Sequence, residues 1–91
     1  MQTTVNIPTA LRQYSENNAT VEVDATDITG ALDQIIEKHP QLKQQLFAGD
    51  GEIRRYINVF LNNQDIRYLE QENTTVKVGD SITLVPAIAG G

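Results

Sequence analysis

The chain has 91 residues, enough for one domain with a modest core and too few for a deep catalytic pocket beside it. Its 7 basic and 12 acidic residues give a formal net charge of −5, which argues against nucleic acid as a partner because phosphate binding needs a basic face. The sequence contains no cysteine, so disulfides, thiol nucleophiles and zinc–thiolate sites are excluded.

The first residues predict a β-hairpin. Val5 and Ile7 alternate with polar residues, as do Val21 and Val23, and a polar turn cluster lies between the two runs over residues 15–18. No basic leader followed by an apolar run precedes the first strand, and no segment reaches the roughly 20 apolar residues of a membrane span. We therefore expect a soluble, cytoplasmic protein with no membrane partner.

One main helix is predicted after the hairpin. Thr26 or Asp27 can cap its N-terminus, and Pro40 ends it by disfavouring helical geometry at the preceding residue. An apolar stripe at spacings of three and four residues marks the face that packs on the sheet: Ile28, Leu32, Ile35, Ile36 and His39. We interpret the single histidine as a helix-end residue and expect no metal site, because no cysteine or second histidine could complete one. A second, short helical turn is predicted by Leu42, Leu46 and Phe47.

The second half of the chain predicts three more strands. Residues 56–62 form an apolar strand, and residues 81–85 form the last strand. Between them, a tight turn at Asn62-Asn63 leads to a short return strand through Ile66 and Tyr68. The resulting order, β-β-α-β-β-β, predicts an α+β fold in which one helix covers one face of one sheet.

Strand alternation divides the side chains of the two longest strands between the faces of this sheet. The residues expected to face the helix are Ile57, Val59, Leu61, Ile82 and Leu84. Phe60 and Val85 then lie on the uncovered face, where an aromatic residue beside an aliphatic one is a candidate docking patch. Scattered apolar surface residues are common, so the alternative of a surface without a partner stays open.

The last residues carry the clearest functional signal. Pro86-Ala87-Ile88-Ala89-Gly90-Gly91 follows the last strand directly, and a terminal glycine pair has no further chain with which to form a turn. It offers a carboxylate on a thin stalk, because glycine permits close backbone approach. Residues 87–91 can span at most about 17 Å, which suits entry into the active site of another protein. A frayed chain end is the alternative interpretation.

The run from Gly79 to Gly91 resembles the ending of the MoaD/ThiS family of prokaryotic ubiquitin-like sulfur carriers, G-D-x-[apolar]-x-[apolar]-x-P-x-x-x-G-G. The resemblance covers the whole chain, and residues 56–67 together with the Pro-Ala-Ile-Ala-Gly-Gly end are most similar to the CysO-type branch. It implies a β-grasp fold, with the first and last strands parallel in the middle of a mixed sheet and one main helix on one face. The domain would comprise residues 1–86, and a flexible C-terminal Gly-Gly tail residues 87–91.

The same resemblance implies a carrier or co-substrate and not an enzyme. An E1-like enzyme would use ATP and magnesium to adenylate the Gly91 carboxylate, and a sulfur donor would displace AMP to leave a thiocarboxylate. The carrier itself would bind no cofactor. Access of the carboxylate would depend on Gly90, Ala89, Ile88 and Ala87, and partner docking on Phe60, Val85 and Pro86.

In the CysO-type branch, the resemblance implies that the sulfur acceptor is aminoacrylate on a PLP-dependent cysteine synthase. A zinc metalloprotease of the JAMM type would then release the new cysteine from the carrier. Three other functions stay open. They are the small subunit of molybdopterin synthase, acting in a stable complex with a large subunit; a non-covalent β-grasp interaction module; and a modifier that forms isopeptide bonds with lysines.

Overall fold

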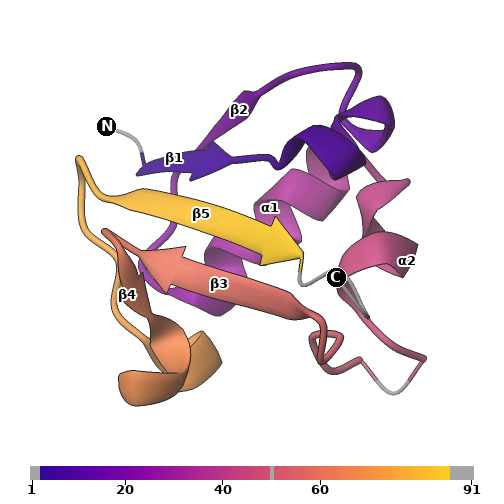
Figure 1. Cartoon of the computed structure of the whole chain (residues 1–91). Helices are drawn as coiled ribbons and strands as arrows, with labels where there is room; N and C mark the ends of the chain where they lie inside the picture. Colours follow the sequence, from indigo (N-terminus) through magenta and orange to yellow (C-terminus); the bar gives the residue numbers. More distant parts are fainter. Residues whose placement is uncertain (1–2, 50, 87–91) are drawn as a thin grey trace.

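The computed structural model describes residues 3–49 and 51–86 of the chain, apart from the side chain of Glu72. These residues contain a five-stranded mixed sheet in the order β2-β1-β5-β3-β4 (Figure 1). The strands are β1 (Thr3–Asn6), β2 (Thr20–Val23), β3 (Ile57–Leu61), β4 (Gln64–Asp65) and β5 (Ser81–Pro86). β1 pairs parallel with β5 in the centre, and the other neighbours pair antiparallel. The predicted N-terminal hairpin and the parallel pairing of the first and last strands are both confirmed.

The main helix, α1 (Ile28–Lys38), begins and ends where the sequence predicts. The Asp27 carboxylate accepts a hydrogen bond from the Gly30 N–H at 2.7 Å, so Asp27 is the N-cap and satisfies one of the free amides of the first turn. The C-cap is His39, whose N–H donates to the Ile35 carbonyl at 2.8 Å. The interpretation of this histidine as a helix-end residue is confirmed. A short second helix, α2 (Leu42–Leu46), follows Pro40.

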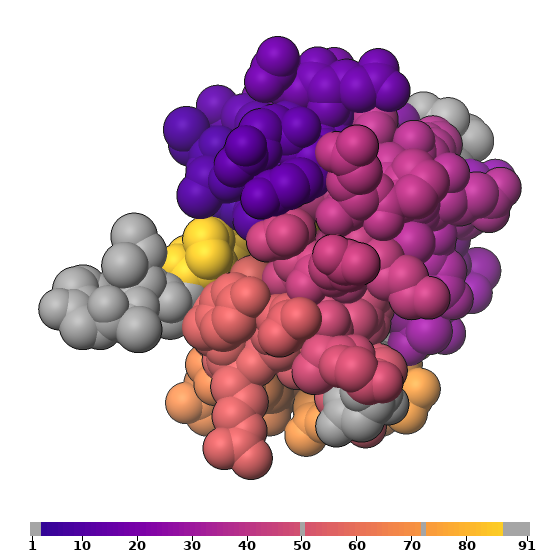
Figure 2. All heavy atoms as spheres, turned by 90° about the vertical axis from the view of Figure 1, so that its right-hand side faces the viewer, coloured from indigo at the N-terminus to yellow at the C-terminus, as the bar shows by residue number. Residues whose placement is uncertain are grey.

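The core lies between the helices and the inner face of the sheet. All five strand residues predicted to face the helix are buried, and the helices contribute Ile28, Ala31, Leu32, Ile35, Leu42 and Leu46. Figure 1 shows α1 behind the sheet, while the opposite face carries no helix of the described residues. In Figure 2 the α2 segment, in magenta, lies beside the N-terminal segment, in indigo. One sheet face therefore builds the core, and no helix of the described residues covers the other.

The predicted return strand is misplaced. β4 comprises Gln64–Asp65, and residues 66–68 form a 3₁₀ turn instead. Asn62 and Asn63 take φ values of 50° and 74°, as in the two-residue hairpin turns with positive φ at both positions, and bring Gln64 opposite Leu61. The Asp65 carboxylate then accepts the Arg67 N–H at 2.8 Å and ends the strand. β4 is consequently very short and pairs with only the last part of β3.

A second carboxylate, that of Asp80, fixes the turn that precedes β5. Asp80 accepts a hydrogen bond from the Asn62 side chain at 2.9 Å through Oδ1, and one from the Lys77 N–H at 2.7 Å through Oδ2. The bond from Asn62, followed by the one from Lys77, lowers the pKa of Asp80. Because the folded-state pKa lies below the unfolded one, this group stabilises the fold above about pH 4. That contribution is lost as the pH falls through the folded-state pKa.

Replacing Asp80 with asparagine should therefore lower the free energy of unfolding at neutral pH. It should also make that free energy depend less on pH in the acid range. We expect the Asp80→Asn variant to lose about 1 kcal/mol at neutral pH, because a charge-assisted hydrogen bond is weakened. Its stability should fall less steeply than that of the natural chain below about pH 4. Urea unfolding at several pH values measures both effects. Asp33→Asn, at an exposed position of α1, is the control; equal acid profiles in the two variants would contradict the assignment.

Candidate functional site

The uncovered face of the sheet brings together the two residues predicted to form a docking patch. In the β3–β5 register, Asn58 lies opposite Val85 and Phe60 lies opposite Thr83. Directly opposed residues share a face, so Phe60 and Val85 are diagonal neighbours, within reach of an aromatic side chain. Val85 is 39% exposed, whereas Phe60 is half-buried. The predicted pair therefore exists on the uncovered face, with the aliphatic member more accessible than the aromatic one.

β1 adds a polar border to this pair that the sequence analysis missed. The Asn6 side-chain amide donates to the Ser81 hydroxyl at 2.8 Å and to the Thr83 hydroxyl at 3.2 Å. Alternation with Val5 and Ile7 already places Asn6 on the outer face. Its partners lie about 75 positions away in the sequence, and only the parallel β1–β5 pairing shows that they meet. We call the set Asn6, Asn58, Phe60, Ser81, Thr83 and Val85 the outer patch.

Pro86 lies at the end of β5, beside the outer patch. It is half-buried and pairs with Ile57, the first residue of β3. Proline has no N–H to donate, and the Ile57 N–H donates to the Arg54 carbonyl at 2.9 Å, away from β5. The predicted tail residues Ala87, Ile88, Ala89, Gly90 and Gly91 lie outside the described residues. The outer patch thus ends at Val85, one residue before Pro86, the last described residue.

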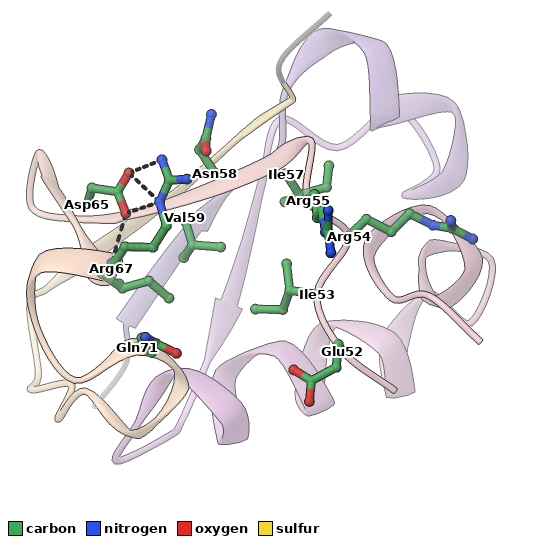
Figure 3. Close-up of a pocket in the computed structure, with 11 residues that line it drawn as sticks. Glu52, Ile53, Arg54, Arg55, Ile57, Asn58, Val59, Asp65, Arg67 and Gln71 are labelled. Atoms are coloured by element: carbon green, nitrogen blue, oxygen red, sulfur yellow. Dashed lines mark hydrogen bonds and ion pairs between the residues drawn. The ribbon is translucent and has the colours of Figure 1, made fainter. Parts of the chain in front are cut away.

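A separate cavity of about 360 Å³ lies beside β3 (Figure 3). Its wall combines apolar side chains, such as Ile53 and Val59, with Arg54, Arg55 and Arg67. Arg67 forms an ion pair with Asp65 at 2.8 Å, and its Nε donates to both carboxylate oxygens at 3.2 Å. These hydrogen bonds lower the pKa of Asp65 and raise that of Arg67. The pair therefore stays ionised at neutral pH and is unsuited to general acid–base catalysis.

The described residues contain neither a cluster of metal ligands nor a membrane-spanning helix. Within residues 3–49 and 51–86, no group of three or more His, Cys, Asp or Glu side chains could hold a metal ion. Across the same part of the chain, the longest helices are too short and polar to cross a membrane.

Comparison with known proteins decides the family. The model of the ThiS family matches residues 5–91, nearly the whole chain. The chain belongs to the ThiS family. The resemblance predicted from the run Gly79–Gly91 is confirmed, and so is the ubiquitin-like β-grasp fold.

Individual relatives of this ThiS-family chain are carriers and modifiers. The sulfur carrier protein CysO of Mycobacterium tuberculosis is 28% identical over 93 positions, covering 100% of both chains. A chain in the crystal structure of the Amycolatopsis orientalis BexX/CysO complex is 34% identical, with a TM-score of 0.89 over 98% of this chain and 99% of that one. Small archaeal modifier protein 1 of Haloferax volcanii is 35% identical over 72 residues, 78% of each chain.

Proposed function

We propose that this ThiS-family chain is a sulfur carrier whose Gly91 carboxylate is adenylated by an E1-like enzyme and converted to a thiocarboxylate. The sulfur would most directly serve cysteine biosynthesis. The observation that carries the proposal is that the family match extends through Gly91, in a chain similar over its full length to CysO. Its relatives are small carriers and modifiers, consistent with a co-substrate and not a catalyst.

The chemistry follows from the reactivity of a terminal carboxylate. With a pKa of about 3.3–3.7, it is ionised at neutral pH and a poor electrophile. Its oxygen attacks the α-phosphorus of ATP and pyrophosphate leaves, forming a mixed anhydride with AMP. A sulfide-level donor then attacks the acyl carbon, AMP leaves, and a thiocarboxylate remains. ATP and magnesium belong to the activating enzyme, so Gly91 and its stalk need only reach that enzyme's active site.

The outer patch is suited to docking this enzyme. Its apolar pair, Phe60 and Val85, is bordered by hydroxyl and amide groups that already hydrogen-bond one another, as around Asn6. An apolar centre with a satisfied polar border is the usual composition of a transient interface. A related chain has been solved in a two-protein complex, BexX/CysO, which supports a role for this fold in presenting a surface to partners.

Replacing Phe60 with serine should weaken activation without unfolding the chain. We expect kcat/KM for adenylation to fall about tenfold or more, because a central aromatic contact of an interface is removed. The control is Tyr68→Ser, which removes an aromatic residue that is 82% exposed and outside the outer patch. Pyrophosphate release measures the rate, and thermal unfolding confirms that each variant is folded. Activation of Phe60→Ser at the natural rate would contradict docking through this patch.

Intact mass after co-expression with the host E1-like enzyme tests the proposed function. A carrier gains the difference between the masses of sulfur and oxygen. A non-covalent interaction module gains nothing. Co-purification then separates the pathways: a PLP-dependent cysteine synthase or a JAMM-type metalloprotease supports cysteine biosynthesis, whereas a molybdopterin synthase large subunit supports the molybdenum cofactor pathway.

A second candidate is protein modification. The observation that favours it is the 35% identity to small archaeal modifier protein 1. The same adenylate would then be attacked by a lysine amine of another protein, and AMP would leave as an isopeptide bond forms. A ladder of lysine adducts in the co-expression experiment would support this function, and its absence beside a clean mass gain would support the carrier.

A further inference from the structure

The cavity beside β3 lies between two irregular segments of the chain. On one side, β4 ends at Asp65 and residues 66–68 form a 3₁₀ turn. On the other side lie residues 52–55, which precede β3 (Figure 3). The apolar side chains that line the space between these segments are Ile53, Ile57, Val59 and Ile66. The cavity therefore has an apolar lining close to the start of β3.

Arg55 is the arginine of this cavity whose side chain is left for an outside partner. Arg54 donates through Nε to the Gln44 carbonyl at 2.8 Å, and Figure 3 shows its side chain pointing away from the other lining residues. Arg67 is bonded to the Asp65 carboxylate at 2.8 Å. Among the described residues, none forms a hydrogen bond or an ion pair with the Arg55 guanidinium. A carboxylate from outside can therefore bind Arg55 without breaking an existing contact.

The cavity is suited to an aliphatic group that lies beside a negative charge. Its volume of about 360 Å³ is at the lower end of the roughly 300–1,000 Å³ of ligand pockets. Its lining carries three arginines and two carboxylates, those of Glu52 and Asp65, and hence a net charge of +1 in a chain of net charge −5. An apolar body with a carboxylate next to it complements both the apolar lining and this local charge.

The cavity also lies where the last described residue of β5 meets β3. Ile57, on the lining, pairs with Pro86 at the end of β5. Asn58, the next lining residue, belongs to the outer patch. An enzyme that docked on the outer patch and took up the predicted tail would cover this end of β3. Its surface would then lie over the cavity as well.

We propose that the cavity beside β3 receives an aliphatic side chain of the activating enzyme, with a carboxylate of the same enzyme bound to Arg55. The inference rests on the proposed carrier function and adds a second contact to the one through the outer patch. The aliphatic side chain would displace water from the apolar lining, and the carboxylate would form a charge-assisted hydrogen bond with the guanidinium. Contacts at two places orient the carrier on the enzyme, as a reaction that depends on positioning requires.

Two other occupants fit the cavity less well. A second copy of the chain brings a net charge of −5, so the two copies repel each other. A free carboxylic acid would meet the same lining and the same guanidinium, but it would gain nothing from the neighbouring outer patch. The experiments below distinguish both from the activating enzyme.

Small probes test the chemistry of the cavity on the ¹⁵N-labelled full chain. N-acetyl-leucine carries an aliphatic side chain and a carboxylate, whereas N-acetyl-leucinamide lacks the charge and N-acetylglycine lacks the aliphatic group. We expect N-acetyl-leucine to shift the amide signals of Ile53, Arg55 and Val59 saturably, and the other two probes to bind at least about threefold more weakly. Equal binding of all three, shifts centred on the outer patch, or the same shifts on raising the protein concentration alone would overturn the proposal.

Activation by the host E1-like enzyme tests the partner. Arg55→Glu should lower kcat/KM for adenylation about fivefold or more, whereas Lys43→Glu, the same charge change at an exposed position of α2, should stay within about twofold. The difference should shrink as salt is added, because screening weakens the ion pair. Thermal unfolding confirms that both variants are folded.

Two outcomes of this experiment have separate meanings. If N-acetyl-leucine binds but Arg55→Glu is activated at the natural rate, the cavity is a site for free acids and the proposal is overturned. If the unaltered chain is not activated at all, the carrier function itself is contradicted. The failure of the inference and the failure of the proposed function are therefore distinguishable.

Discussion

Deletion of Gly91 should abolish sulfur loading, leaving the intact mass of the shortened chain unchanged after co-expression with the host E1-like enzyme. The deletion moves the terminal carboxylate back by roughly 3.5 Å, the length of one extended residue. A displacement of even about 1 Å can cost a factor of about 10² in a reaction that depends on positioning. The loss should therefore be complete in practice, although the fold is unaffected.

Gly49→Ala provides the control for this deletion. Gly49 is exposed, and a Cβ added there meets nothing within 4 Å, so this variant also loses a glycine but should load normally. Intact-mass spectrometry compares the two variants in parallel. A mass gain in the Gly91 deletion would place the reactive group elsewhere and remove the basis of the carrier proposal.

Leu84→Ala should cause a large loss of stability. Leu84 is 1% exposed, on the inner face of the central strand β5 and opposite Val59 of β3. Truncating a buried leucine typically costs about 2–5 kcal/mol, because apolar contacts are lost and a cavity remains. Domains of this size have a total stability of roughly 5–15 kcal/mol. We therefore expect the melting temperature to fall by about 10–25 °C.

The neighbouring residue supplies the matched control for Leu84. Val85 belongs to the same strand but faces outward, so Val85→Ala should cost well under about 1 kcal/mol. Urea and thermal unfolding measure both variants. Equal losses would show that the outer face is as tightly covered as the inner one, which would be incompatible with a docking surface there.

The two variants together separate the roles of β5. Its inward residues, Ile82 and Leu84, pack in the core, while Thr83 and Val85 belong to the outer patch. Val85→Ala should leave the fold intact, so any effect on activation measures docking. β5 thus joins the core of the sheet to Pro86, the last described residue before the predicted tail.

Local patterns were sufficient for most of the secondary structure. Alternation identified β1, β2, β3 and β5 because the two faces of a strand differ in burial. Asp27 and Pro40 marked the limits of α1 because a cap and a helix-breaking proline act within one turn. The prediction of a return strand through Ile66 and Tyr68 was wrong. The hydrogen bonds between Asp65 and Arg67 stabilise a 3₁₀ turn there in place of strand pairing. The spacing of apolar residues alone could not show that a turn would compete with a strand at this point.

What the sequence by itself determined was the order of the elements, the inward and outward sides of each strand, and the family indicated by the run from Gly79 to Gly91. Only the tertiary structure decided which distant residues become neighbours. It placed Asn6 against Ser81 and Thr83, and gathered Arg54, Arg55 and Arg67 around one cavity. The physical reason is range: propensities, caps and turns act over a few residues, whereas the order and length of paired strands depend on packing across the whole sheet.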